Sequence, residues 1–208
     1  SIKNNIEIKN FIKSHILDPL DKVDQKRPSK PQDIVLYGFG RIGRLVSRIM
    51  AQMTGPGNYY RLRAIVVRKG SDTNDLLKRA SLLRRDSVHG SFHGTIRVDN
   101  ETETLVINGN PVKIIYANGP KDINYSDYDI DKPIIIDNTG VWREEKDLSL
   151  HLESGASKVV LTAPGKGQIK NIVNGINNDI LNESDNVISA ASCTTNAVSY
   201  THLRAHET

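Results

Sequence analysis

The only cysteine of the chain, Cys193, lies in a run of small and hydroxylated residues, Ser-Ala-Ala-Ser-Cys-Thr-Thr-Asn, at positions 189–196. A cysteine thiol can act as the nucleophile of covalent catalysis when its surroundings activate it. A single cysteine is also common as a small buried hydrophobic side chain. The residue type alone leaves both interpretations open, so the flanking Ser192 and Thr194 and the rest of the chain must decide between them.

Three glycines, Gly38, Gly40 and Gly43, form a G-x-G-x-x-G pattern directly after the apolar residues 34–37. Residues 42–50 follow with the apolar spacing of a helix, so the pattern joins a strand to a helix. In a dinucleotide-binding fold the first glycine permits the turn and the second lets the backbone approach the pyrophosphate. The third allows the helix to pack closely on the strand. The sequence therefore predicts a dinucleotide site, with phosphate at the start of the helix.

The second predicted strand, residues 61–68, ends at Arg68, and Lys69 follows it. A dinucleotide fold that prefers NAD places an acidic residue at this tip, whereas a nearby arginine accommodates the 2′-phosphate of NADP. Arg68 and Lys69 would attract that phosphate. We therefore expect NAD or NADP as the cofactor, with a slight preference for NADP. In the alternative interpretation Arg68 faces solvent and Asp72 fills the acidic role, which favours NAD.

The other segments alternate between helices and strands. Residues 74–85 have helical periodicity, with Asn74 or Thr73 as the N-cap. A helix is also expected over residues 144–156, ended by Gly155. Strands are expected over residues 94–98, 103–107, 112–116, 132–140, 157–165 and 186–191. This order predicts an α/β fold, a doubly wound, Rossmann-like and mostly parallel sheet.

In such a sheet, ligands bind in a crevice beyond the carboxyl ends of the strands. This rule brings together five parts of the chain: residues 38–44, Arg68, and residues 138–140, 162–165 and 192–196. Cys193 follows the last predicted strand and is therefore expected at the edge of the same crevice.

Composition excludes several other classes of protein. The formal net charge of the 208 residues is +4 and the basic residues are scattered, so we expect no nucleic acid partner. No apolar run approaches the roughly 18 residues of a membrane-spanning helix, and a single cysteine cannot form an internal disulfide. We expect a cytoplasmic protein with no membrane partner and no metal. Residues 1–32 are expected to form an amphipathic helical extension and a linker.

The motifs YGFGRIGR, RRDSVHGSFHGT, LVINGNPVKI, NTGVW, GASKVVLTAPGK and SAASCTTNA occur in that order between residues 37 and 197. Together they resemble the cofactor domain of the phosphorylating glyceraldehyde-3-phosphate dehydrogenase family. The resemblance covers about residues 33–198. It implies a cofactor domain over residues 33–191 and the start of an α+β catalytic domain over residues 192–208. Its substrates would be an aldehyde phosphate, glyceraldehyde 3-phosphate, and inorganic phosphate, and the full-length protein would be a homotetramer.

The resemblance also implies residue roles. Cys193 would attack the aldehyde to form a thiohemiacetal, which loses hydride to the nicotinamide and leaves a thioester that phosphate cleaves. Ser192 and Thr194 would bind phosphate. The residues implied or predicted to bind the cofactor are Gly38, Gly40, Arg41, Ile42, Gly43, Arg68, Thr139, Gly140 and Thr162. One departure concerns the end of the second strand, where the family's usual Asn-Asp pair is missing. The resemblance therefore does not imply that the chain uses NAD strictly.

Five further residues have expected roles outside the chemistry. Arg84, Arg85 and Asp86 are interpreted as a surface or subunit-contact cluster. His89 is interpreted as a structural or interface histidine, and Trp142 as a packing residue.

The end of the chain departs from the family pattern. The family continues into a second domain that supplies the histidine base, whereas SYTHLRAHET follows here. We expect residues from about 199 not to be native sequence, and we do not expect His202 or His206 to be the base. The chain would then be an inactive part of a dehydrogenase. The alternatives are a non-catalytic NAD(P)-binding module and a related erythrose-phosphate or semialdehyde dehydrogenase.

Overall fold

The computed structural model describes residues 11, 30–53, 58–70 and 74–206 of the chain. The chain divides into two compact units, one of residues 1–31 with 55–59 and one of Gln32–Thr54 with Tyr60–Thr208. The helix and linker predicted for residues 1–32 fall almost entirely outside the described residues. Every element named below belongs to the second unit.

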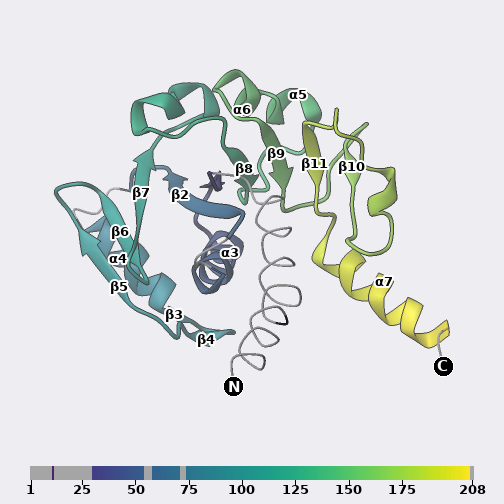
Figure 1. The fold of residues 1–208 in the computed structure, drawn as a ribbon, viewed down its shortest axis with the longest axis horizontal. Coiled ribbons are helices and arrows are strands. Elements are labelled where there is room, and N and C mark those ends of the chain that lie inside the picture. The colour runs from purple at the N-terminus through teal and green to yellow at the C-terminus, as the bar shows by residue number, and fades with distance from the viewer. Residues whose placement is uncertain (1–10, 12–29, 54–57, 71–73, 207–208) are drawn as a thin grey trace. The chain divides into compact units, whose positions relative to one another are not determined.

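A sheet of nine strands forms the second unit (Figure 1). Its strand order is β10-β11-β9-β8-β1-β2-β7-β6-β5. The bounds are β1 Gln32–Tyr37, β2 Tyr60–Val67, β5 Ile96–Asp99, β6 Thr104–Ile107, β7 Asn110–Tyr116, β8 Ile134–Asp137, β9 Lys158–Leu161, β10 Lys170–Asn171 and β11 Val187–Ser189. Pairing is parallel from β10 to β7, and β6 is antiparallel to both β7 and β5. The predicted α/β, doubly wound and mostly parallel sheet is confirmed.

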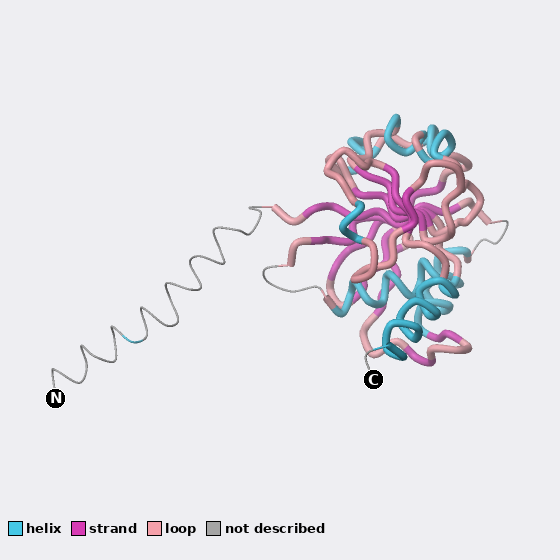
Figure 2. The backbone as a smooth tube through the Cα atoms, turned by 90° about the vertical axis from the view of Figure 1, so that its right-hand side faces the viewer, coloured by secondary structure: helices cyan, strands magenta, loops and turns pink. Residues whose placement is uncertain are grey.

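Helices lie on both faces of the sheet, as the edge-on view in Figure 2 shows. The α-helices are α3 Arg41–Gln52, α4 Asp75–Arg84, α5 Glu145–Leu148, α6 Leu150–Glu153 and α7 Cys193–His206. Short 3-10 helices are η2 Pro120–Asp122, η3 Tyr125–Tyr128 and η4 Asn178–Ile180, and the two-residue strands β3 Arg85–Asp86 and β4 Gly90–Ser91 form a separate hairpin. Among the described residues, no helix is long and apolar enough to cross a membrane.

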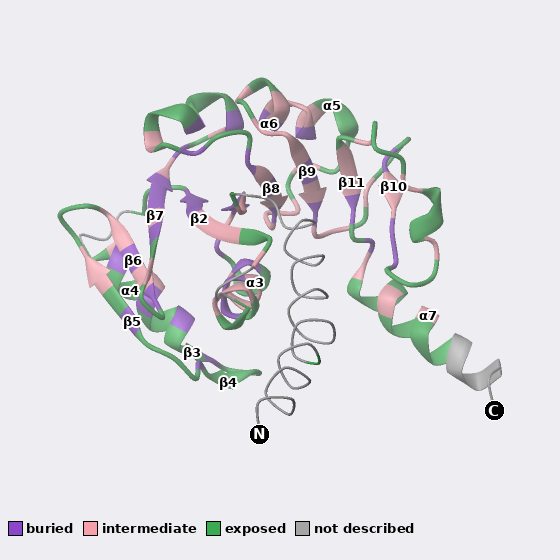
Figure 3. Ribbon diagram, in the orientation of Figure 1, coloured by how far each residue is buried: buried purple, intermediate pink, exposed green. Residues whose placement is uncertain are grey.

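The central strand β1 shows why the sheet is covered on both faces. Ile34 and Leu36 pack into one apolar cluster with residues of α3 and α4, while Val35 and Tyr37 pack into another with residues around η2 and η3. Side chains alternate between faces along a strand, so an apolar run with both sets buried needs cover on both sides. Figure 3 shows buried residues along the central strands and a largely exposed α7.

Residues 144–156 and residues 170–171 differ from their predictions. Residues 144–156 form two short helices, α5 and α6, where one helix was expected. At the break the Ser149 hydroxyl donates to the carbonyl oxygen of Glu145 at 2.7 Å, a bond that competes with the regular helix pattern and bends helices. The short strand β10 was not predicted, because two residues carry no readable alternation.

Candidate active site

A cavity of about 350 Å³ opens at the carboxyl end of β1, between β2 and β8. The chain leaves β1 toward β2 on one side and later returns to β8 on the other, so this is the switch point at which doubly wound sheets bind ligands. The lining residues are Tyr37, Gly38, Phe39, Gly40, Val66, Val67, Arg68, Arg79, Ala117, Thr139, Val141 and Trp142.

Each of the three glycines in the turn suits its position for a different structural reason. Gly38 has a φ of +94°, a conformation that favours glycine. A Cβ added to Gly43 would collide with the carbonyl oxygen of Gly38, so α3 can approach β1 only with glycine there. Gly40 is different, because its φ is −72° and no heavy atom lies within 4 Å of an added Cβ. Gly40 therefore faces open space. A ligand can approach the backbone only at a position of this kind.

The structure divides the predicted cofactor residues into two groups. Gly38, Gly40, Arg68 and Thr139 line the cavity. The others lie around it: Arg41 and Ile42 begin α3 with exposed side chains, Gly43 packs under the turn, Gly140 follows Thr139, and Thr162 directly follows β9. The Thr162 hydroxyl donates to the carbonyl oxygen of Asp137 at 3.0 Å and so joins the ends of β8 and β9. Cofactor contact by these residues stays a prediction.

A buried carboxylate network lies behind Thr139. Oδ1 of Asp137 accepts hydrogen bonds from the Thr139 backbone N–H at 2.8 Å and from its hydroxyl at 2.7 Å. Nε2 of His151 lies 3.2 Å from Oδ2 of Asp137, and both side chains are fully buried. This network holds the turn after β8 against the cavity.

Aromatic side chains form one wall of the cavity. The ring of Tyr37 lies 4.6 Å from that of His151 and 5.7 Å from that of Trp142. Burial has the largest effect and the nearby Asp137 carboxyl group the next largest, and together they raise the pKa of Tyr37 to about 12. The phenol of Tyr37 therefore stays neutral. Trp142 packs as expected and also lines the cavity, which the packing interpretation did not include.

The charged tip of β2 differs in detail from its prediction. Arg68 lines the cavity together with Arg79 from α4, whereas the ammonium group of Lys69 lies 5.8 Å from the centre of the Tyr116 ring. Lys69 is not among the lining residues. Asp72, the alternative acidic partner, falls outside the described residues.

Asp86 corrects one sequence interpretation. It was interpreted as part of a surface or subunit-contact cluster, and the surface interpretation is wrong, because only 3% of its side chain is exposed and Arg44 lies 3.7 Å from its Oδ2. Its Oδ1 accepts from the backbone N–H groups of Val88 and His89, each at 3.0 Å. These hydrogen bonds hold the pKa of Asp86 well below its usual range, and the bond from the His89 backbone has the largest effect. The carboxylate ties the start of α3 to the hairpin of β3 and β4.

Cys193 is the first residue of α7, which follows β11 at the same edge of the sheet. The hydroxyl of Ser192 caps this helix by accepting from the Thr195 backbone N–H at 2.9 Å. Ala191, just before the cap, is buried with a φ of +58°, a sharp bend that turns the chain into α7. Cys193 itself is exposed. Three strand spacings, about 14 Å, separate β11 from β1.

Hydroxyl groups surround the start of α7. The oxygen of Ser192 lies 3.0 Å from that of Thr194 and 2.6 Å from that of Thr195. The Asn196 amide donates to the carbonyl oxygens of Ala190 and Ser192, each at 2.9 Å. The polar residues next to the cysteine therefore build and cap the turn that presents it.

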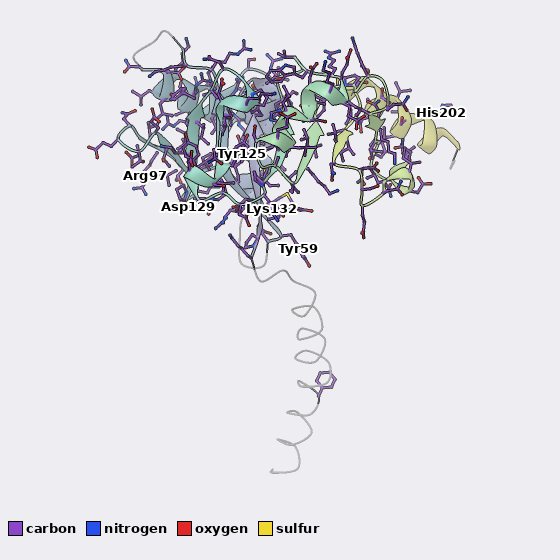
Figure 4. The ribbon with its side chains drawn as sticks, turned by 90° about the horizontal axis from the view of Figure 1, so that it is seen from above. Tyr59, Arg97, Tyr125, Asp129, Lys132 and His202 are labelled. Carbon is purple, nitrogen blue, oxygen red and sulfur yellow. The ribbon has the colours of Figure 1, made fainter. Side chains whose placement is uncertain are left out.

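His202 lies nine residues beyond Cys193 in the same helix. At 1.5 Å and 100° per residue, this spacing puts it about 13 Å along the axis and on the opposite side of α7. Figure 4 shows His202 toward the C-terminal end of that helix. The arrangement agrees with the expectation that His202 is not the base for Cys193. The side chain of His206 is not described.

Sequence reasoning missed three residues of the site: Arg79, Asp137 and His151. Arg79 occupies an amphipathic helix that gives no sign of which charged residue turns inward. Asp137 ends a strand of apolar residues, a position typical of ligand or turn residues, and this signal could have identified it. His151 carries no readable signal, because only the fold brings it to Asp137.

Comparisons with known proteins agree with this geometry. A family model described as "Glyceraldehyde 3-phosphate dehydrogenase, NAD binding domain" matches residues 32–145. The matched residues include the glycine turn, Arg68 and Thr139 but not Cys193.

Similar proteins extend the comparison. A "Glyceraldehyde-3-phosphate dehydrogenase-like protein" of Pseudomonas aeruginosa is 53% identical over 94% of this chain and 42% of its own length. A protein of Thermotoga maritima named "Glyceraldehyde-3-phosphate dehydrogenase" is 37% identical over 79% of this chain and 46% of its own length. A protein of the same name in Mycoplasma pneumoniae is 35% identical over 82% of this chain and 47% of its own length.

The chain thus spans less than half the length of these relatives. The match to the family model nevertheless covers more than half of the chain and includes the cavity's glycine turn. With the parallel sheet and its switch-point cavity, this shows that the chain belongs to the family of glyceraldehyde 3-phosphate dehydrogenase NAD-binding domains.

Proposed function

We propose that the chain is the cofactor-binding part of an NAD(P)-dependent oxidoreductase that oxidises glyceraldehyde 3-phosphate with uptake of inorganic phosphate. The observation that carries the proposal is the placement of Cys193. It begins a capped helix at the same sheet edge as the cavity and follows β11, which lies about 14 Å from β1. An extended dinucleotide in the cavity can reach from one to the other.

The cavity fits such a cofactor. Gly40 leaves space for a phosphate at the start of α3, where free backbone N–H groups and the helix dipole favour an anion. Thr139 and the aromatic pair Tyr37 and Trp142 would hold the part of the dinucleotide that extends toward β8. When bound, the nicotinamide supplies the acceptor for a hydride. We propose that the chain accepts NAD or NADP and prefers NADP, because Arg68 and Arg79 are the charged residues of the lining.

The nucleophile would be the thiolate of Cys193. It adds to the aldehyde carbon to form a thiohemiacetal, and after oxidation the same sulfur is the leaving group when phosphate attacks the thioester. The free backbone N–H groups at the start of α7 would be the candidate donors to the negative charge that develops on the substrate oxygen. The hydroxyls of Ser192 and Thr194 are the candidate donors to phosphate.

The general base would come from outside this chain. The relatives are more than twice as long as the matched region, and the family resemblance assigns the base to a second domain. The opposite-face position of His202 on α7 supports this proposal.

A binding titration and a turnover assay test the proposal separately. Trp142 is the only tryptophan of the chain and lines the cavity, so its fluorescence reports occupancy. We expect NADP or NAD to change Trp142 fluorescence in the 208-residue chain. We expect Cys193-dependent oxidation of glyceraldehyde 3-phosphate, with phosphate, in a protein that carries the relatives' full length. Cofactor binding without any turnover of this aldehyde, of erythrose 4-phosphate or of a semialdehyde in the long protein would favour a non-catalytic binding module.

A further inference from the structure

Two arginines from different elements meet at the carboxyl end of β2. Arg68 follows the strand directly and Arg79 projects from α4, and both line the cavity. No carboxylate occurs among the described residues that line this cavity. This corner is therefore cationic, at the place where dinucleotide folds distinguish a ribose 2′-hydroxyl from a 2′-phosphate.

The guanidinium group of Arg79 is held in place before any ligand arrives. Its Nε donates to Oδ2 of Asp75 at 2.7 Å, and its Nη2 donates to the carbonyl oxygen of Arg68 at 3.0 Å. Its side chain is 19% exposed and that of Asp75 is 14% exposed. Neither bond uses Nη1. A fixed guanidinium loses little conformational freedom on binding and presents planar donors that suit phosphate oxygens.

Asp75 also accepts a hydrogen bond from a residue of β7. Its Oδ2 also accepts the hydroxyl of Tyr116 at 3.1 Å. Burial, followed by the hydrogen bond to Asp75, raises the pKa of Tyr116, so the phenol remains a donor. The carboxylate of Asp75 is therefore used to orient Arg79, and it is not a lining residue that could accept a bond from a ribose hydroxyl.

We propose that Arg68 and Arg79 form the binding site for the 2′-phosphate of NADP, and that Asp75 and Tyr116 are the positioning residues that hold Arg79 there. The inference rests on the proposed function, and it replaces Lys69 with Arg79 as the second cation of the site. Lys69 lies over the ring of Tyr116 and serves as the matched control. A 2′-hydroxyl at the same place is neutral and could accept only an ordinary hydrogen bond, whereas the 2′-phosphate offers charge and three acceptor oxygens, so the two arginines favour NADP over NAD.

Calorimetric titration of the 208-residue chain with NADP and with NAD tests the site without any enzymatic reaction. Arg79→Gln should weaken NADP binding by at least about tenfold, the size of one lost charged hydrogen bond, and leave NAD within about twofold. Arg68→Gln should act in the same direction. Lys69→Gln should change the ratio of the two affinities by less than about twofold. Circular dichroism establishes that each variant is folded.

The positioning role of Asp75 has its own readout. Asp75→Asn should lower the NADP preference while NAD affinity is kept, because the released Arg79 loses orientation but keeps its charge. In the wild-type chain the preference should fall as salt rises, since the two arginines are partly exposed. The fragment adenosine 2′,5′-bisphosphate should bind more tightly than ADP, and Arg79→Gln should remove that difference.

Three outcomes overturn the inference. Equal weakening of NAD and NADP by Arg79→Gln would make Arg79 a general or structural residue. Normal NAD binding with no NADP preference would refute the 2′-phosphate site and the proposed NADP preference, and would leave the proposed NAD-dependent oxidation of the aldehyde standing. Binding of neither dinucleotide by the folded chain would refute the proposed function and the site together.

Discussion

Nε2 of His151 lies 3.2 Å from Oδ2 of Asp137, and neither side chain has any exposed surface. The other carboxyl oxygen of Asp137 accepts both hydrogen bonds from Thr139, which lines the cavity. An ionised carboxylate can only accept, which assigns the proton of His151 to Nε2, so three donors converge on one buried acid. Removing one partner of such a buried network costs more than the bond is worth, because the remaining groups cannot reach water.

The first prediction concerns this network. In Asp137→Asn one acceptor oxygen becomes an NH₂ donor, which must face either His151 or the two Thr139 donors. The free energy of unfolding, measured in urea, should fall by about 1–3 kcal/mol. Cofactor affinity should fall as well, because the turn that carries Thr139 loses its anchor. The exposed residue Asp131 provides the control, and Asp131→Asn should leave both quantities unchanged. An Asp137→Asn chain as stable as the wild type would contradict the network.

The second prediction compares two glycines of the same turn. Gly40→Ala adds a methyl group to open space at a φ of −72°, so stability should stay within about 0.5 kcal/mol. Dinucleotide affinity should nevertheless fall at least about tenfold, because the methyl group keeps the phosphate from the backbone. Gly43→Ala should behave in the opposite way. Its methyl group meets the Gly38 carbonyl, so stability should fall by about 1–3 kcal/mol.

Thermal unfolding and calorimetric titration of both variants separate the two effects. If Gly40→Ala binds the cofactor with wild-type affinity, Gly40 does not lie against the phosphates and the orientation of the cofactor in the cavity is wrong.

These glycines show how much of the site could be predicted from the sequence. The pattern of Gly38, Gly40 and Gly43 between a strand and a helix predicted both local structure and a cavity, because all its information is local. Arg79 and His151 could not be predicted, because their partners are brought to them by the fold. The burial of Asp86 was missed for a related reason. A run of charged residues is usually exposed, but Asp86 lies against the start of α3 and meets Arg44.

The third prediction concerns pH. Hydrogen bonds from His89 and Val88 hold the pKa of Asp86 well below its usual range in the folded chain. The unfolded chain takes up this proton near a pKa of about 3.9, whereas the folded chain does so only at lower pH. The stabilisation from Asp86 is therefore complete above this value and is lost as the pH falls below it.

Urea unfolding of the wild type and Asp86→Asn at several pH values measures this contribution. The wild type should be the more stable chain near neutral pH. The difference should shrink steadily below about pH 4. A constant difference at every pH would mean that the ionised carboxylate contributes nothing beyond its shape.

The last prediction concerns the chemistry of Cys193. In a protein of the relatives' length, Cys193→Ser should lower kcat for glyceraldehyde 3-phosphate by at least about a thousandfold, because a hydroxyl group is a far weaker nucleophile than a thiolate. The 208-residue chain should bind cofactor but show no measurable turnover. His202 lies on the opposite side of α7, and general acid–base help is typically worth about 10²–10⁴-fold. The discriminating measurement is reduction of cofactor by the short chain at high enzyme concentration, with Cys193→Ser and His202→Ala as paired variants. Turnover that disappears in both variants would show that a histidine of α7 reaches the thiol, and that the base need not come from a second domain.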